Sequence, residues 1–492
     1  MNANDWREVD RDRLGKHLEH ELRKRDMTRR DLVRGGVRLA SGVGLGWLFA
    51  ACSGQGEEEG PSPQPAQTGA NFTGTLRVRG LADDLPGPIR AAADKALGFA
   101  LRFDVAGTAT SERKVLNEPD SFDVFSGRHY QYDRLWSSGA FRPLDRTKIP
   151  NWEQVSKLFK LGKIDPASVE CTVGQGDAPV TKLYVDPERS GKWPASPETS
   201  GENEGVLVQW ADLSKTPVVG IGDEPPWITG CPQSFGMDSM GYNGDVIYKE
   251  PGQVSWAELL NPAYRGRVAL GGDPEIALQD AAAATRALGL MTFRSLGNMT
   301  KEEIDGLIKI LLDLKKNGHF HSVWQTFEES VNLIASGEVI LAPMPSSAVA
   351  LLVVQGVNAR FAAPPEGFRG WSGGQAIAAH VTDPAKLQAC YDYINWGLSR
   401  EPGAIMMRQG YYHALQETSR QFLEPEEWDY WIEGEPAAKD LPGITGQVGD
   451  IRKGAVRDGG AFIDRACRCS SWNSYPQEAE YLNQRWSEFW PD

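Results

Sequence analysis

Short apolar runs alternate with helical stretches from Thr73 onward, and this alternation limits the possible folds more than any other pattern in the chain. In the run "TLRVRGL", Leu76 and Val78 alternate with Arg77 and Arg79, as in a half-buried strand. The helical stretch "IRAAADKAL" follows, and then the apolar runs "FALRFDVAG" and "SFDVFSG". Strands that alternate with helices form parallel sheets whose C-terminal loops bind ligands. The sequence therefore predicts an α/β fold.

The second half of the chain continues this pattern. Ser255 and Glu258 in "SWAELLNP", and Thr300 and Glu303 in "TKEEIDGLIKILLDLKKNG", are spaced as capping boxes, so each pair predicts a helix start. The second helix should end at Gly318. The runs "GRVALGGDPE" and "GEVILAPMP" predict buried strands, and no internal repeat of fixed period is present.

The N-terminal region resembles an export signal. The stretch "TRRDLVR" precedes an apolar segment that Arg38 interrupts, so the segment is too short and too polar for a comfortable membrane span. It is similar to a twin-arginine signal, with Arg29 and Arg30 as the pair, and it ends in a lipoprotein box at residues 49–52. The resemblance implies lipidation of Cys52. We expect residues 1–52 to be the signal and residues 53–71, rich in Gly, Pro and Glu, to be a flexible tether.

The charge balance restricts the ligands. The formal net charge is −14 over 492 residues, and Lys and Arg cluster only near the N-terminus. Nucleic-acid binding needs clustered cations that neutralise phosphates, so no nucleic-acid partner is expected. An acidic body suits cationic or neutral ligands.

The cysteines leave two alternatives open. If Cys52 is lipidated, five cysteines remain, an odd number. A Cys171–Cys231 disulfide would close the base of the polar insertion at about residues 151–231, but unpaired small core residues are equally compatible with the sequence. Cys467 and Cys469 lack a second ligand pair at zinc-site spacing.

Residues 370–374 read Gly-Trp-Ser-Gly-Gly, the G-x-S-x-G pattern of a hydrolase nucleophile elbow. An elbow needs a strand before the serine and a helix after it, whereas here "PPEGFR" precedes Ser372 and the strand-like "GQAIAAHV" follows it. His380 and His413 are the candidate bases downstream. We keep an exported serine hydrolase as the alternative, and expect Trp371 to be the ligand-contacting residue of this stretch.

Several segments together resemble one family. "FDVFSGRHYQYDRLWSSGAFRPLDRTKIPNW", "GMDSMGYNGD", "SWAELLNPAYRGRVALGGDPE", "SGEVILAPMPSSA" and "WSGGQAIAAHVTDPAKLQACYDYINWGLSREPGAIMMRQGYY" are similar, in this order, to the periplasmic spermidine/putrescine-binding proteins of ABC importers. The resemblance covers most of residues 72–420 outside the insertion. It implies a two-lobed type II periplasmic-binding-protein fold with a ligand cleft between the lobes, and chain crossings near residues 243–245 and near Trp371.

The resemblance also implies a domain layout and a function. Lobe 1 would comprise residues 72–243, lobe 2 residues 244–370, a return to lobe 1 residues 371–420, and C-terminal helices, mainly of lobe 2, residues 421–492. The chain would be a non-catalytic, lipid-anchored periplasmic protein without a cofactor. It would capture a polyamine or a related small polar solute by cleft closure and deliver it to an ABC permease.

The family's ligand-binding positions carry over only in part. They fall on Asp83, Tyr130, Phe235, Asp238, Asp273, Trp371 and Tyr411. Three expected cleft residues are replaced, by Leu81, Pro345 and, in place of an ammonium-binding aspartate, Gly373. A buried ammonium needs carboxylates, so we expect a monoamine, amino acid-like or zwitterionic solute instead of a linear polyamine.

Other ligands remain as alternatives. These are a carboxylate, a phosphonate or a ferric ion, the last because residues 411–413 read Tyr-Tyr-His. His319 and His321 would lie on one face of a strand, but without an obvious third metal ligand. A binding protein that serves a sensor instead of a permease is a further possibility.

Overall fold

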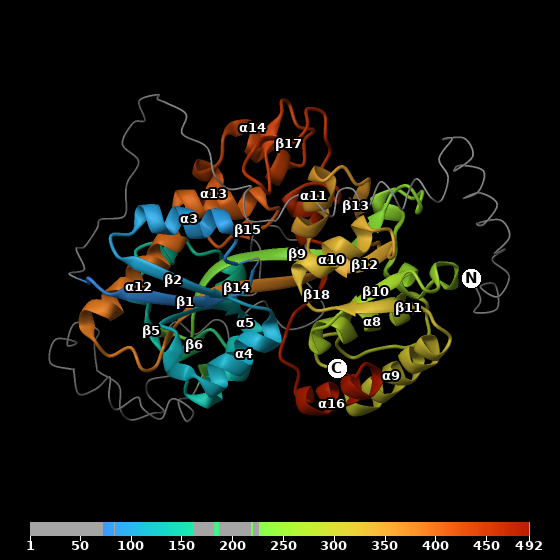
Figure 1. Ribbon diagram of the computed structural model, residues 1–492, viewed down its shortest axis with the longest axis horizontal. Coiled ribbons are helices and arrows are strands. Elements are labelled where there is room, and N and C mark those ends of the chain that lie inside the picture. Colours follow the sequence, from blue (N-terminus) through green and yellow to red (C-terminus); the bar gives the residue numbers. More distant parts are fainter. Residues whose placement is uncertain (1–71, 83, 162–181, 186–217, 220–225, 492) are drawn as a thin grey trace.

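The computed structural model describes residues 72–491 apart from residue 83 and the segments 162–181, 186–217 and 220–225 (Figure 1). The predictions for the export signal with Arg29 and Arg30, for Cys52, the tether, Asp83 and Cys171 lie outside these residues. Among the helices described, none is both long enough and apolar enough to cross a membrane.

The predicted β-α-β start is confirmed. β1 (Thr75–Gly80) lies between β2 (Ala100–Val105) and β3 (Val124–Arg128), and both pairings are parallel. The helices α3 (Gly87–Ala96) and α4 (Thr108–Asn117) connect these strands, and α5 (His129–Leu135) follows β3. We call this part of the molecule lobe 1.

A second parallel group forms lobe 2. β10 (Val268–Gly271) lies between β11 (Phe320–Trp324) and β12 (Leu341–Met344). Its helices are α8 (Pro274–Ala287), α9 (Lys301–Lys316), α10 (Phe327–Ala335) and α11 (Ser346–Val354).

The two predicted capping boxes have different outcomes. The Thr300 and Glu303 box forms at the start of α9, and Gly318, with φ 68°, ends that turn. At the other pair a helix does begin directly after Ser255, but it is a short 3-10 helix (Trp256–Leu260). The box itself does not form, because Ser255 Oγ accepts from the Ala257 N–H and donates to Glu366.

Two long antiparallel strands cross between the lobes, β9 (Cys231–Asn243) and β14 (Phe368–Ala378) (Figure 1). The first half of β9 pairs with β14 and β15 (Tyr412–His413), and its second half pairs with β12 and β13 (Ala359–Phe361). Gly236 lies opposite Trp371 where the lobes meet. The crossing expected near Trp371 thus lies inside β14. The lobe boundary expected at residue 243 falls at the end of β9, whereas β9 already changes from pairing with β14 to pairing with β12 between Asp238 and Ser239.

The described ends of the insertion are part of the core. β5 (Leu144–Asp145), before the insertion, pairs with β8 (Trp227–Ile228), so its start and end are adjacent as expected. β6 (Tyr184–Val185) joins β8, and β7 (Val218–Val219) joins β6. The side chains of β6 are fully buried, so this part of the polar insertion belongs to the core. Nearby lie β4 (Phe141–Arg142) and α6 (Lys157–Leu161).

The C-terminal part is more than helices. After α12 (Pro384–Gly397) and α13 (Arg400–Arg408) come α14 (Pro425–Trp428), the hairpin β16 (Leu441–Pro442) and β17 (Val448–Ile451), and α15 (Phe462–Ala466). β18 (Cys469–Trp472) extends the main sheet beside β14. Only α16 (Ala479–Phe489) packs into the lobe 2 core, through Leu482, Trp486 and Phe489.

The structure decides between the cysteine alternatives for Cys231. It is a free, buried thiol at the start of β9, in contact with Gln233 Nε2, so a Cys171–Cys231 disulfide is wrong. Cys390 and Cys469 are also free and buried, whereas Cys467 is disulfide-bonded. Burial raises the pKa of Cys231 to about 12, which makes it a packing residue and not a nucleophile.

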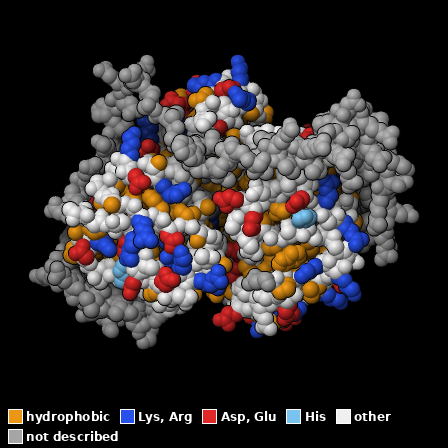
Figure 2. Space-filling model, viewed as in Figure 1, with side chains coloured by type: hydrophobic (Ala, Val, Ile, Leu, Met, Phe, Trp, Pro, Cys, Tyr) orange, Lys and Arg blue, Asp and Glu red, His pale blue; other side chains and the backbone are white. Residues whose placement is uncertain are grey.

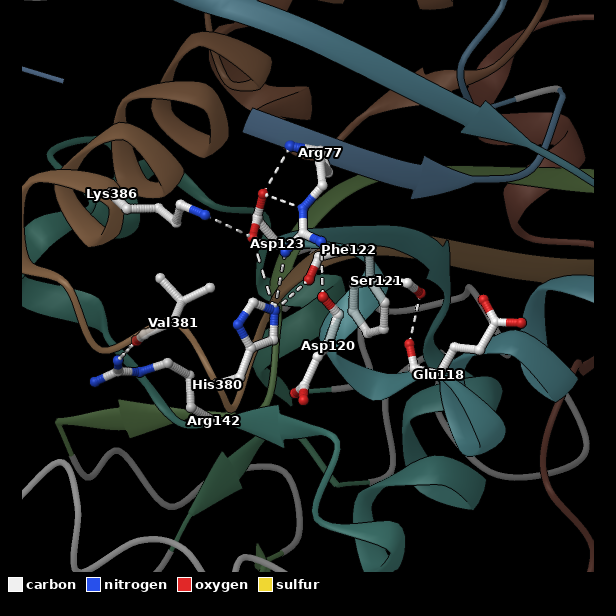
Figure 3. A network of polar contacts seen from close by, with 10 residues as sticks. All are labelled: Arg77, Glu118, Asp120, Ser121, Phe122, Asp123, Arg142, His380, Val381 and Lys386. Atoms are coloured by element: carbon white, nitrogen blue, oxygen red, sulfur yellow. Dashed lines mark hydrogen bonds and ion pairs between the residues drawn. The ribbon is translucent and has the colours of Figure 1, made fainter. Parts of the chain in front are cut away.

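A buried ion pair holds the strands of lobe 1 to α12 (Figure 3). The fully buried Asp123 accepts from Arg77 Nε, Nη2 and the Arg77 backbone N–H, and Lys386 Nζ lies 3.3 Å away. Burial alone would raise the pKa of Asp123, but the hydrogen bonds from Arg77 hold it below its ordinary value.

We expect Asp123→Asn to lower the free energy of unfolding by about 3 kcal/mol, because two cations lose their buried carboxylate. Urea unfolding at pH 7 measures this difference. The depressed pKa stabilises the fold above the unfolded-state pKa, so the difference should shrink as the pH falls through the folded-state pKa. Asp120→Asn is the matched control, since this exposed carboxylate points away from the network (Figure 3). Equal losses in both variants would contradict the prediction.

Candidate functional site

Two predicted ligand-binding residues meet across the lobes. Tyr130, in the first turn of α5, follows β3, and Asp273 caps α8 after β10. Both therefore lie at the carboxyl ends of parallel strands, where α/β sheets bind ligands. The Tyr130 hydroxyl donates to Asp273 Oδ2 at 2.6 Å, and Tyr130 is almost fully buried. Asp273 is also the N-cap of α8, because its Oδ1 accepts from the Ile276 N–H.

Further charged groups surround this pair. Arg134 Nη1 of α5 lies 2.6 Å from Glu112 Oε2 of α4, in the same lobe, and 3.9 Å from Glu275 Oε1 of α8, in the other lobe. Arg134 therefore joins the two lobes. Burial raises the pKa of Glu112 to about 7, although Arg134 opposes this rise, and Asp273 raises it further. Burial, and then the charge of Asp273, also raise the pKa of Glu275.

The raised pKa of Glu112 predicts a pH-dependent stability. The folded state keeps a proton on Glu112 at pH values where the unfolded state has lost it, so this contribution is complete below about pH 4.5 and falls as the pH rises to about 7. We expect the melting temperature to fall less between pH 5 and pH 8 in Glu112→Gln than in the unaltered protein. Glu401→Gln, at an exposed position, should follow the unaltered protein. Identical pH profiles for all three proteins would contradict the assignment.

A second cluster surrounds Trp371. The Arg128 guanidinium lies over the indole, 4.1 Å from its centroid, and pairs with Asp84. Tyr411 packs edge-on against the same indole at 4.9 Å, and its hydroxyl is 2.6 Å from the Ser347 hydroxyl of α11. Asp84 is partly buried, and the other residues of the cluster are fully buried, namely Arg128, Ser347, Trp371 and Tyr411.

This arrangement is a cation site already filled by the protein. An aromatic face beside a carboxylate attracts a cation, and Arg128 supplies one. Position 373 is Gly, and a Cβ there would lie 3.1 Å from Arg128 Nη1. The same Cβ would lie 3.6 Å from Asp84 Oδ1, so a side chain at position 373 would sit directly against the Arg128–Asp84 ion pair.

The predicted ligand contacts Phe235 and Asp238 both lie on β9. Phe235 has no exposed surface and packs against Tyr412, Phe462 and Phe159 with ring centroids 5.4 to 6.1 Å apart. Asp238 is buried opposite Arg369 of β14. The structure thus brings Tyr130 to Asp273 and Trp371 to Tyr411, and places Phe235 in the core. A ligand contact by Phe235 or Asp238 remains a prediction.

Ser372 does not stand on an elbow. It lies in the middle of β14, 4% exposed, between β9 and β3. Its Oγ is 3.0 Å from His129 Nδ1, whereas the ring of His380 bonds to the Phe122 carbonyl and that of His413 to the Gly397 carbonyl. Burial lowers the pKa of His129 to about 3, and its Nε2 has no hydrogen-bond partner. A buried serine and a histidine without an orienting third group do not suit nucleophilic catalysis.

The candidate metal ligands are also separated. Buried His319 bonds to the Leu259 carbonyl, whereas His321 is more exposed and lies near Glu338. His413 contacts the Gly397 carbonyl. Across the residues the model describes, no three His, Cys, Asp or Glu side chains are grouped to hold a metal ion.

A small cavity of about 30 Å³ lies beside the Trp371 cluster, between β14, α3 and α13. Asp84, Ser126, Ser234, Gly373 and Gln375 are among its lining residues, and Gln375 Oε1 has no protein partner. This volume holds about one or two water molecules. With the lobes in this arrangement, the cavity is therefore too small for an amino acid or a polyamine.

Sequence reasoning missed Arg128, Arg134 and Glu112. Arg128 ends β3, the position from which α/β sheets contact ligands, so its place in the chain was a usable signal. Glu112 and Arg134 carry no local signal, because only the packing of α4 on α5 brings them together.

The comparisons agree with this geometry. Residues 223–432 match the family model of bacterial extracellular solute-binding proteins. No curated protein matches the sequence. A putative spermidine/putrescine ABC transporter structure from Listeria monocytogenes is similar with a TM-score of 0.54 at 14% identity, covering 85% of this chain and 99% of that chain.

Two further structures have similar scores. An ABC transporter substrate-binding protein from Bradyrhizobium japonicum has a TM-score of 0.52 at 15% identity, with coverages of 85% and 100%. A binding protein from A. tumefaciens in complex with agropinic acid has a TM-score of 0.51 at 13% identity, with coverages of 85% and 99%. The chain thus has the two-lobed type II fold of the periplasmic binding proteins, and its residues 223–432 are similar to the bacterial extracellular solute-binding proteins.

Proposed function

We propose that this protein is the extracytoplasmic solute-binding component of an ABC importer, which closes its lobes over a small polar solute. The observation that carries the proposal is the Tyr130–Asp273 hydrogen bond, which joins the lobes at the carboxyl ends of their parallel strands. The crossing strands β9 and β14 supply the connection about which such lobes move. The similar structures from Listeria monocytogenes and Bradyrhizobium japonicum are described as ABC transporter proteins.

The solute we propose is a monoamine, an amino acid-like molecule or another zwitterion, and not a linear polyamine. Arg128 occupies the face of Trp371, so a second cation there would meet a like charge. Asp273, with Glu275 and Glu112 nearby, offers acidic groups for one ammonium beside Tyr130. The fold does not select the ligand. One similar structure is a putative spermidine/putrescine ABC transporter, and another is a binding protein in complex with agropinic acid.

A thermal-shift screen of the full chain against polyamines, monoamines, amino acids, carboxylates and phosphonates tests this proposal, followed by calorimetry of each hit. At about 100 times its Kd, a ligand adds about 2.7 kcal/mol to the stability, which a raised midpoint reveals. Tyr130→Phe should lower the affinity for a true ligand, whereas Tyr248→Phe, at an exposed tyrosine, should leave the affinity unchanged. Micromolar or tighter spermidine binding would refute the proposed solute class, and a carboxylate or phosphonate hit would replace it.

Anchoring through Cys52 and delivery to a permease complete the proposal. Cys52→Ser should move the protein from the membrane fraction to the soluble periplasmic fraction. Co-purification of a permease with the ligand-loaded protein would support an importer, and co-purification of a sensor kinase would support the alternative role.

A further inference from the structure

A basic pocket on lobe 1 lies outside the interlobe site. β1 and β2 are parallel neighbours, and their alternation places Arg77, Arg79 and Arg102 beside one another, above the buried Leu76 and Val78. With Lys114 of α4, these cations line a depression of about 330 Å³. Lys and Arg side chains are visible over this part of lobe 1, with acidic ones between them (Figure 2). We call this depression the basic pocket.

The charges of the basic pocket do not balance internally. Its four cations face two carboxylates, Asp104 and Glu118. Asp104 is already shared, because Arg79 Nη2 lies 2.6 Å and Lys114 Nζ 3.0 Å from it. Behind Arg77, Asp123 is likewise shared with Lys386 (Figure 3). The pocket therefore keeps a positive surplus on a chain whose net charge is −14.

Arg79 is built to receive an acceptor. Its side chain is 3% exposed, and its guanidinium lies over the Phe122 ring at 5.4 Å. Nε and Nη2 donate to Asp104, but the buried Nη1 has no hydrogen-bond partner. A buried charged donor without an acceptor is costly, so an oxygen ligand at Nη1 would recover that energy.

The register of the strands adds a second cost. Arg77 and Arg102 are direct partners in the β1–β2 ladder, so two like charges are neighbours on one face of the sheet. Arg102 is exposed, and among the residues that the structure describes no carboxylate forms an ion pair with it. An anion between these guanidinium groups would remove the repulsion.

We propose that the basic pocket binds a small oxyanion, namely phosphate, sulfate or a phosphate ester. Guanidinium groups bind such oxygens in bidentate pairs, and Lys114 adds a point charge. Phe122 forms an apolar wall below Arg79, which limits competing water. This site is separate from the interlobe site and does not depend on the proposed function.

Calorimetry of the full chain with inorganic phosphate and with sulfate, at constant ionic strength in chloride, tests the proposal. We expect saturable binding that weakens at least about tenfold in Arg102→Gln, whose side chain is exposed, and in Arg79→Gln. Arg113→Gln is the matched control, because Arg113 is exposed on α4 outside the pocket. Its affinity should stay unchanged.

Vesicles distinguish the source of the phosphate group. Binding to phosphatidylglycerol vesicles that Arg102→Gln abolishes, and that free phosphate displaces, would identify a lipid headgroup, whereas phosphate binding without vesicle binding would identify a soluble anion. The absence of phosphate and sulfate binding would overturn the proposal. Equal affinities of Arg102→Gln, Arg79→Gln and the unaltered protein would also overturn it, since the anion would then bind elsewhere.

Discussion

Replacing Arg128 by alanine is expected to lower the free energy of unfolding by about 3–5 kcal/mol, the cost of removing one partner of a buried ion pair. The Arg128 and Asp84 side chains are 8% and 6% exposed, so water cannot replace the lost charge freely. The indole of Trp371 also loses the guanidinium at 4.1 Å. Denaturant unfolding of the variant measures the loss, and Arg90→Ala, at an exposed position on α3, is the control.

The same variant tests whether the Trp371 face is a cation site. We expect methylguanidinium or a small alkylamine to raise the melting temperature of Arg128→Ala, because the added cation can occupy the vacated space between Trp371 and Asp84. The unaltered protein and Arg90→Ala should not respond. A stable Arg128→Ala protein that ignores added cations would show that Arg128 is only a packing residue, and our argument against a linear polyamine would fail with it.

The second large effect is expected at Asp280. Arg369 Nε of β14 lies 2.7 Å from Asp280 of α8, and Arg369 Nη1 donates to Asn473 at 2.9 Å. The two charged side chains are 7% and 2% exposed. Asp280→Ala should therefore cost about 3–5 kcal/mol, because it leaves a buried guanidinium without its carboxylate. The interaction holds a crossing strand to lobe 2, so the loss should also loosen the placement of the lobes.

Two comparisons isolate this effect. Glu478→Ala removes an exposed ion pair with Lys301, and we expect a loss below about 1 kcal/mol. The double variant Asp280→Leu with Arg369→Met should recover part of the single-variant loss, because it leaves no unpaired charge. Urea unfolding of the three variants decides the matter. Similar losses for Asp280→Ala and Glu478→Ala would contradict the assigned role.

At the site, the sequence predicts some of the residues but not the contacts between them. Trp371 and Tyr411 are predicted as ligand contacts and do lie together. The guanidinium over the indole, however, comes from Arg128, which lies 243 residues earlier in the chain than Trp371. The family resemblance implies a ligand contact at Phe235, and nothing in its local sequence indicates the three aromatic rings that pack around it. A residue's place in the chain does not reveal what packs around it.

The sequence by itself determined the local elements. The alternation in β1 and the capping box of α9 depend on residues within a few positions of one another, so the sequence pattern alone predicts them. Only the tertiary structure decided which charges meet. The Tyr130–Asp273 and Arg369–Asp280 contacts join residues 143 and 89 positions apart, and their energies depend on burial that the folded lobes create.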